Sequence, residues 1–184
     1  MEIVNYPHPA LRTPAQPVTS IDGDLQRLVG QMLEQMYKRE GLGLAAPQVA
    51  EGRRVIVMNF AGDPEQKDQE FVAINPVIVE TGGGILEERE GCLSFPGLFG
   101  KVKRSKSVRV QAYNLKGELY EMTCEELPAR VWQHEIDHLD GKLFIDKMVM
   151  LSRLNSKKQV QAFIDEYQEL LAKGKIDPIM QPKY

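Results

Sequence analysis

The chain has 184 residues, of which 42% are hydrophobic and 27% charged, and its formal net charge is −3. This length suits one domain with a substantial core, so we expect a single domain over residues 1–184. The 23 basic and 26 acidic residues nearly balance, and we expect no direct binding to nucleic acid or membranes. No membrane-span pattern or signal peptide is evident, so we expect a cytoplasmic protein whose two cysteines are free thiols or metal ligands.

The N-terminal part predicts an extended arm followed by a helix. Residues 1–20 contain four prolines, which disfavour helix and indicate an extended segment with turns. An amphipathic helix is then predicted from residue 22 or 24 to residue 39, because apolar residues recur there at the helical spacing. An aspartate can cap its N-terminus, and Gly41 can end it.

The middle of the chain predicts strands. Residues 54–60 are typical of a buried strand, and residues 71–80 form a second β-rich segment that Asn75-Pro76 breaks or bulges. Residues 81–84, with the sequence Thr-Gly-Gly-Gly, predict a turn after it. Residues 108–112 and 119–124 flank a turn sequence and predict a hairpin.

The last part predicts a further helix. After a short apolar segment at residues 143–145, helical spacing returns over residues 156–173, with Gly174 at the end. The expected core stripe of this helix comprises Val160, Phe163, Ile164, Tyr167, Leu170 and Leu171.

The segment from His134 to His138, with the sequence His-Glu-Ile-Asp-His, is the main chemical signal. On a helix, residues four apart lie on the same face, so His134 and His138 can bind one metal ion. Glu135 lies beside them, where it can act as a general base without being a ligand. The alternative is a pair of core histidines satisfied by hydrogen bonds.

A helix is expected around this segment. Pro128 suits a first helical turn, and Leu127 and Val131 continue the stripe of the two histidines. Gly141 fits the position just past the helix end. The histidines are therefore expected on a buried face.

A catalytic site of this kind needs a third protein ligand and an open position. Phe144 stands where a metzincin would have its third histidine, and a packing or surface role is expected for His8 in the proline-rich arm. A downstream helical carboxylate, as in thermolysin, would be Asp165, Glu166 or Glu169. Cys92 is favoured over Cys124, because its segment contains glycine, serine and proline and can bend toward the helix, whereas Cys124 has a strand-like setting that suits a packed thiol.

Three segments together resemble the signature motifs of the peptide deformylase family, in the family's order. They are residues 41–48 (GLGLAAPQ), residues 90–94 (EGCLS) and residues 133–138 (QHEIDH). The similarity extends over residues 7–12 and most of the chain to about residue 150. It implies an α+β domain in which antiparallel strands surround a central metal-binding helix, with a further helix in the N-terminal half and a C-terminal helix.

The resemblance implies that Cys92, His134 and His138 hold one divalent metal ion. The family works with Fe²⁺ in cells, whereas Zn²⁺, Ni²⁺ or Co²⁺ can occupy the isolated protein. The family acts on peptides that begin with N-formylmethionine. The side chain of this methionine is expected in an apolar pocket walled by Leu127 and Val131.

The resemblance also implies roles around the metal. Glu135 would transfer the proton, while the Gln48 amide and the Leu93 backbone N–H would stabilise negative charge on the formyl oxygen. The backbone at Gly43 and Gly91 would hydrogen-bond the extended peptide.

The implied activity is removal of the N-formyl group from the initiator methionine of nascent polypeptides, with release of formate. The expected partners are N-formylmethionyl peptides and the ribosome. A zincin-type metallopeptidase is the enzymatic alternative, and a metal-stabilised binding module is the non-enzymatic one. A closed structural site normally has four protein ligands, and three stand out here.

Overall fold

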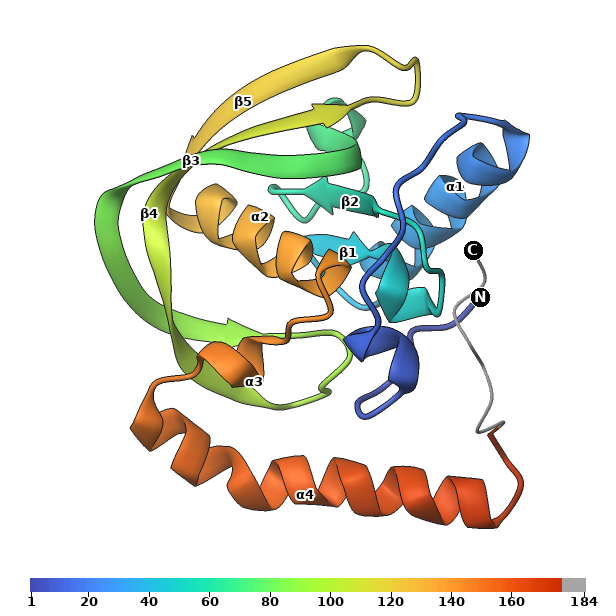
Figure 1. Cartoon of the computed structure of the whole chain (residues 1–184), viewed down its shortest axis with the longest axis vertical. Helices are drawn as coiled ribbons and strands as arrows, with labels where there is room; N and C mark the ends of the chain where they lie inside the picture. Colours follow the sequence, from blue (N-terminus) through green and yellow to red (C-terminus); the bar gives the residue numbers. More distant parts are fainter. Residues whose placement is uncertain (177–184) are drawn as a thin grey trace.

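The structure is a computed structural model that describes residues 1–176. Within these residues it contains four α-helices and one antiparallel sheet with strand order β1-β2-β3-β4-β5. The predicted α+β class is therefore confirmed, while residues 177–184 of the expected single domain lie outside the described part. None of the helices in residues 1–176 has the length and apolar character needed to span a membrane. Figure 1 shows the sheet curving around α2 (Glu126–Leu139).

The predicted first helix is α1 (Gly23–Lys38), and its capping aspartate is Asp22, which accepts a hydrogen bond from the Leu25 amide at 2.9 Å. Its end differs from the prediction, because Glu40 adopts the left-handed conformation, with φ of 55°. Gly41 follows and donates to the Met36 carbonyl at 2.9 Å. A Cβ at Gly41 would lie 2.7 Å from the Leu93 side chain, so close packing explains this glycine.

The first two strands of the sheet follow α1. Strand β1 (Gly43–Ala45) leads into a 3₁₀ turn, η2 (Ala46–Val49), and strand β2 (Val55–Asn59) pairs antiparallel with β1. All five residues of β2 are buried, as its apolar sequence predicts. The core between α1 and these strands comprises Leu25, Leu28, Val29, Met32, Met36, Leu44, Ala46, Val49, Val55, Val57 and Ile74.

Strand β3 (Glu70–Gly91) begins after a third 3₁₀ turn, η3 (Lys67–Gln69), and runs without a break for 22 residues. The turn predicted over residues 81–84 is therefore wrong. Gly83 and Gly84, with φ of 71° and 82°, instead form a bulge opposite a single residue of β4, Lys106. Such a bulge increases the local twist and helps the strand curve, whereas a reversal would have ended it.

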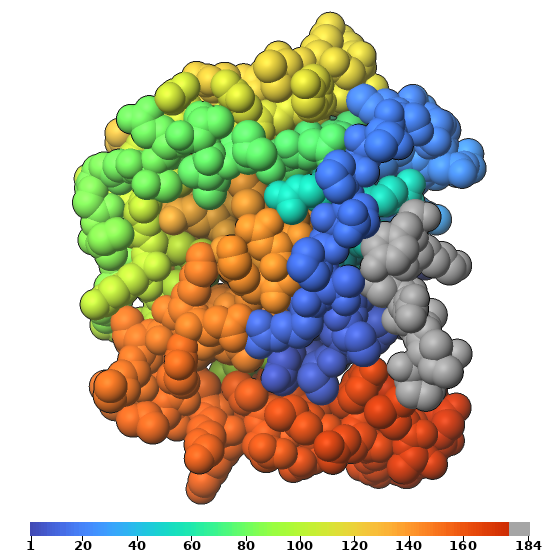
Figure 2. All heavy atoms as spheres, in the orientation of Figure 1, coloured from blue at the N-terminus to red at the C-terminus, as the bar shows by residue number. Residues whose placement is uncertain are grey.

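A second irregularity lies at Asn75, with φ of 52°, as the sequence predicts. The Asn75 side chain donates to the Val18 carbonyl at 2.9 Å and accepts from the Val18 amide at 2.8 Å. The bulge therefore fastens the N-terminal arm to the sheet. Farther toward its start, the arm contains a 3₁₀ turn, η1 (Pro9–Arg12). Figure 2 shows the arm lying between the segment after α2 and helix α4.

The predicted hairpin is confirmed by the pairing of β4 (Phe99–Tyr113) with β5 (Leu119–Glu125). The chain then enters α2, which packs against the sheet through a core that includes Trp132 and Leu139. A short helix, α3 (Phe144–Lys147), follows where an apolar segment was expected.

Helix α4 (Met150–Ala172) begins six residues before the predicted start at residue 156. The apolar stripe predicted for this helix is only partly buried. Ser156, outside the stripe, is the one buried residue of α4. The helix lies along the lower side of the molecule in Figure 1 and covers α3 and the N-terminal arm from one side only. One-sided coverage explains the partial burial.

Gly141, just past the end of α2, has φ of 69°, and an added Cβ would lie 2.6 Å from the Arg12 carbonyl oxygen. We expect Gly141→Ala to lower the free energy of unfolding by about 1–3 kcal/mol, because alanine is strained at positive φ and displaces the arm. Urea denaturation measures the effect. The control is Gly30→Ala inside α1, where an added Cβ meets no atom within 4 Å and should stabilise by up to about 1 kcal/mol. Equal stability of the two variants would contradict the expectation.

Candidate active site

Helix α2 and the segment after β3 bring together three side chains that could bind a metal ion. The His134 and His138 rings lie 5.0 Å apart between centroids, and Cys92 Sγ lies 3.3 Å from His138 Nε2. The ligand atoms of all three residues lie within 4.8 Å of one another. Two donors that bind one ion tetrahedrally at ~2.1–2.3 Å are roughly 3.5 Å apart, so this group fits a single ion.

The other candidate ligands lie elsewhere in the described chain. Cys124 is a buried residue of β5, where burial raises the pKa of its thiol. His8 is buried in the arm, and its Nδ1 accepts a hydrogen bond from the Ala10 amide at 3.2 Å, which is a packing role. The carboxylates considered in the last helix are exposed on α4, and they are Asp165, Glu166 and Glu169.

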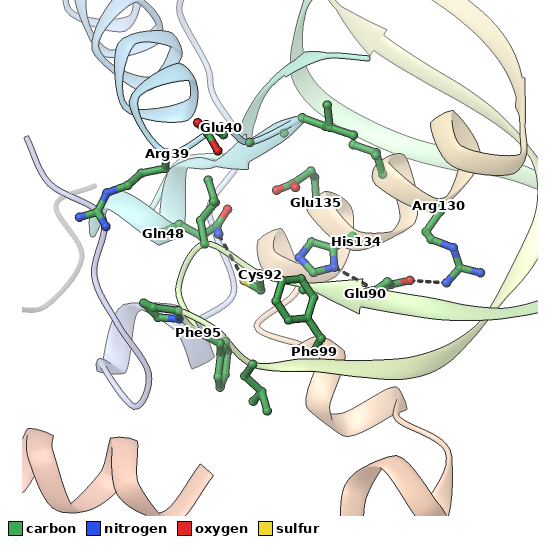
Figure 3. A pocket seen from close by; sticks show the side chains of 18 of the residues that line it. Arg39, Glu40, Gln48, Glu90, Cys92, Phe95, Phe99, Arg130, His134 and Glu135 are labelled. Atoms are coloured by element: carbon green, nitrogen blue, oxygen red, sulfur yellow. Dashed lines mark hydrogen bonds and ion pairs between the residues drawn. The ribbon is translucent and has the colours of Figure 1, made fainter. Parts of the chain in front are cut away.

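A buried ion network holds His134 in place. Glu90 Oε2 lies 3.1 Å from His134 Nδ1, which leaves Nε2 free to bind a metal. Arg104 donates twice to Glu90, at 2.9 and 3.0 Å, and Arg130 donates at 2.6 Å. Arg104 also donates to Asp137, the residue before His138. Figure 3 shows the chain of contacts from Arg130 through Glu90 to His134.

The network sets the charge of these groups. Burial alone would raise the pKa of Glu90, but hydrogen bonds from His134 and Arg104 hold this pKa well below its ordinary value. Burial alone would lower the pKa of His134, but hydrogen bonds with Cys92 and Glu90 raise it to about 10. For His138, burial keeps the pKa well below the ordinary value.

Glu135 lies beside the three ligands and does not belong to the network. Its Oε2 is buried without a hydrogen-bond partner, and burial raises its pKa to about 7. A Cβ at Gly43 would lie 2.7 Å from Glu135 Oε1, so the missing side chain at Gly43 makes room for this carboxylate. A buried, unpartnered carboxylate next to an open cleft is suited to exchange protons with a bound molecule.

Gln48 lies on the other side of Cys92. Its Oε1 accepts a hydrogen bond from the Ala45 amide at 2.8 Å, and this contact turns the NH₂ group toward the site. Nε2 then lies 3.5 Å from Cys92 Sγ and 3.4 Å from Ser94 Oγ (Figure 3). The η2 turn thus presents a donor to the position beside the ligands.

A cleft of about 560 Å³ opens onto these groups. His138 lies behind its wall, almost fully buried. Leu127, at the rim, is 48% exposed, so the apolar stripe predicted for α2 begins at solvent and becomes buried at Val131. The residues predicted for the site that line the cleft are Gly43, Gln48, Gly91, Cys92, Leu93, Leu127, Val131, His134 and Glu135.

Sequence reasoning gave no role to the charged residues behind the ligands. Arg130 precedes His134 by four residues and therefore lies on the same face of the helix. Since that face was expected to be buried, the sequence could have indicated that Arg130 needs an acidic partner. Arg104 gave no such signal, because it lies in a β4 segment with several lysines around it. Phe99 and Arg89, which also line the cleft, were missed as well.

The sequence-family model of polypeptide deformylase matches residues 1–154. The chain belongs to the polypeptide deformylase family. A peptide deformylase of Acidobacterium capsulatum is 48% identical over 151 residues, which cover 82% of this chain and 88% of that protein. The chain spans 53% of a longer chloroplastic relative, peptide deformylase 1B of Solanum lycopersicum, at 44% identity over 80% of this chain.

Solved structures of the family have the same fold. Peptide deformylase of Plasmodium falciparum is 39% identical, with a TM-score of 0.88 over 91% of this chain and 98% of that chain. Peptide deformylase 1B of Arabidopsis thaliana, in complex with an inhibitor, is 38% identical, with a TM-score of 0.89 over 100% of this chain and 97% of that chain. The resemblance in the three motifs is therefore confirmed, as is an enzyme of this type. The zincin alternative is not favoured.

The two cysteines provide a direct test of the ligand group. We expect Cys92→Ser to bind less metal, because serine is a poorer ligand than a thiolate for a borderline-soft ion. Cys124→Ser should keep full metal content, since Cys124 lies apart from the histidines. Elemental analysis of both purified variants checks this, and undiminished metal in Cys92→Ser would contradict it.

Glu90 is expected to affect metal affinity through its contact with His134. We expect Glu90→Gln to weaken metal binding by about 10–100-fold, because it weakens the contact that orients the imidazole and leaves two buried arginines without their shared charge. Glu88→Gln is the matched control, since Glu88 pairs with the same Arg130 at 3.1 Å but its side chain is 52% exposed. Competition with a chelator measures both affinities. Equal losses in the two variants would contradict a specific role for Glu90.

Proposed function

We propose that the chain removes the N-formyl group from the initiator methionine of nascent polypeptides and releases formate. The observation that carries this proposal is the convergence of Glu135, Gln48 and the group Cys92, His134 and His138 on one cleft of a deformylase-family chain. Each has the chemistry that hydrolysis of a formamide needs. Helix α2 is, in this proposal, the central metal-binding helix of the domain.

We propose that Cys92, His134 and His138 hold one divalent metal ion. One thiolate and two imidazoles suit Fe²⁺, Zn²⁺, Co²⁺ and Ni²⁺, and we propose Fe²⁺ in the cell. This proposal is supported by the three ligand atoms, which lie within 4.8 Å of one another, and by the contact of His134 Nδ1 with Glu90, which leaves the other ring nitrogen for a metal. When bound, such an ion polarises a carbonyl and lowers the pKa of water.

Glu135 is the proposed proton carrier. Its raised pKa, about 7, is close to neutrality, where a carboxyl group can both accept and return a proton. It takes a proton from the attacking water and delivers it to the leaving amine. Because Glu135 is buried against Gly43, it stays within reach of both positions.

Gln48 and the Leu93 backbone N–H are the proposed donors to the formyl oxygen, on which negative charge develops. The Ala45 contact fixes the Gln48 amide before substrate binds, so little reorganisation is needed during reaction. Leu93 follows Cys92 directly and packs against Gly41, which ties the two donor segments together.

The peptide is proposed to bind as an added strand along β1. Leu42 accepts a hydrogen bond from Asn59 of β2, whereas the Ala45 amide turns the other way, toward Gln48. Because backbone groups alternate along a strand, those of Gly43 also face the free edge. Gly91 lines the opposite wall, and Leu127 and Val131 contribute to the proposed pocket for the methionine side chain.

Binding to the ribosome and a cytoplasmic location are predictions that accompany this proposal. Relatives include a bacterial protein and proteins named chloroplastic, so the reaction is proposed wherever nascent chains begin with formyl-methionine.

Formate release from a formyl-Met tripeptide by anaerobically purified, metal-analysed protein tests the function. We expect Glu135→Gln to keep its metal and lose turnover by at least about 100-fold, because the amide cannot accept the proton. Full metal occupancy in the wild-type protein without formate release would overturn the proposal, and cleavage of unformylated protein would revive the peptidase alternative.

A further inference from the structure

Arg89 and Phe99 form one wall at the mouth of the cleft. The Arg89 guanidinium lies over the Phe99 ring, 4.6 Å from its centroid, and both residues line the cleft. Phe99 is 51% exposed, so its ring reaches solvent at the mouth of the cleft. In Figure 3 its ring lies between Cys92 and the Glu90 side chain, below His134.

The ring of Phe99 lies directly against Gly91. The two residues are paired across β3 and β4, and a Cβ at Gly91 would lie only 2.5 Å from a ring atom. Because Gly91 has no side chain, the Phe99 ring can lie against the strand. The position of the ring is thereby fixed, and Arg89 stacks on it.

Arg89 keeps its charge available. The neighbouring carboxylates on β3 already have cationic partners: Glu87 lies 3.7 Å from Lys101, Glu88 3.1 Å from Arg130, and Glu90 is held in the buried network. Within residues 1–176, Arg89 has no carboxylate within 4.0 Å.

Three other charged groups line the cleft outside that network and outside the ligands. Glu135 lies beside the metal-binding group, and Arg39 and Glu40 lie at the end of α1, across from β3. Figure 3 shows the Arg39 guanidinium pointing away from Glu135. Arg39 and Glu40 offset each other in charge at the end of α1, and Arg89 supplies the positive charge on the β3 side of the mouth.

The strand geometry of the proposed substrate brings its third residue to Arg89. Arg89 and Gly91 lie two residues apart on β3, so their positions share one face of the strand. If the first residue of the peptide lies beside Gly91 and the peptide runs antiparallel to β3, its third residue lies beside Arg89, because two residues of extended chain cover roughly 6.6 Å on each strand.

We infer that Arg89, supported by the Phe99 ring, is a specificity-determining residue that favours an acidic side chain at the third position of the formyl peptide. This inference rests on the proposed function. A carboxylate there pairs with a guanidinium that has no carboxylate partner within residues 1–176, whereas a lysine is repelled. The contact is exposed, so we expect about a two- to fivefold ratio of kcat/KM between aspartate and lysine peptides at low salt.

The test compares formyl-Met-Ala-Asp, formyl-Met-Ala-Lys and formyl-Met-Ala-Ala peptides, all with amidated C-termini so that the third side chain alone differs in charge. We expect the wild-type protein to prefer aspartate over lysine, and Arg89→Glu to reverse this order. The ratio should fall toward one in 0.5 M NaCl, since salt screens exposed charges. A merely structural role would change all three rates in parallel.

Lys101→Glu is the matched control. Lys101 is paired across the sheet with Arg89 and undergoes the same change of charge, but it does not line the cleft. We expect the Lys101→Glu variant to keep a kcat/KM that is higher for the aspartate peptide than for the lysine peptide, as in the wild-type protein. Phe99→Ala should weaken the preference, because the guanidinium loses its platform.

Different results would contradict this inference and the proposed function on which it rests. Formate release from all three peptides with a ratio that Arg89→Glu leaves unchanged would overturn the inference alone. A preference reversed by Arg39→Glu and not by Arg89→Glu would also overturn the assignment. No formate from any peptide with the metal-loaded wild-type protein would overturn the proposed function, and this inference with it.

Discussion

The buried carboxylate of Glu90 is the group on which the arrangement of the site depends. It receives hydrogen bonds from Arg104 of β4 and Arg130 of α2, and it contacts His134 of the same helix. A charge with this degree of burial is stable only with such partners, and removing one partner leaves the others uncompensated. The network therefore fixes the position of α2 against β3 and β4 and, with it, the direction in which His134 points.

Close backbone approaches at glycines complete the site from the opposite wall. Gly43 leaves room for the Glu135 carboxylate, Gly41 for Leu93, and Gly91 for the Phe99 ring. At each position a Cβ would come within 3.0 Å of another side chain. Gly43 thus lets β1 approach α2, Gly41 lets the end of α1 approach the segment after β3, and Gly91 lets the Phe99 ring of β4 lie against the end of β3.

The shape of the sheet decides whether these elements meet at all. Strand β3 curves around α2 and ends at Gly91, next to Cys92, and it can do so because the bulge at Gly83 and Gly84 bends it without ending it. Had the chain reversed there, as its Thr-Gly-Gly-Gly sequence suggested, residues 90–94 would have been carried away from α2. The same local sequence serves a turn or a bulge, and pairing with β4 selects the bulge.

The sequence by itself determined the features that depend on local periodicity and residue chemistry. These include the amphipathic α1 with its Asp22 cap, the hairpin of β4 and β5, the placement of His134 and His138 on one helix face, and the family. The three motifs also indicated part of the cleft lining, including Gln48, Cys92 and Glu135, and the sequence already favoured Cys92 over Cys124. Only the tertiary structure decided how close Cys92 lies to His138, that Glu90 shares its charge with Arg104 and Arg130, and that Phe99 carries Arg89. These contacts join residues 10 to 46 positions apart, and their partners are set by strand register and helix packing, which no local pattern encodes.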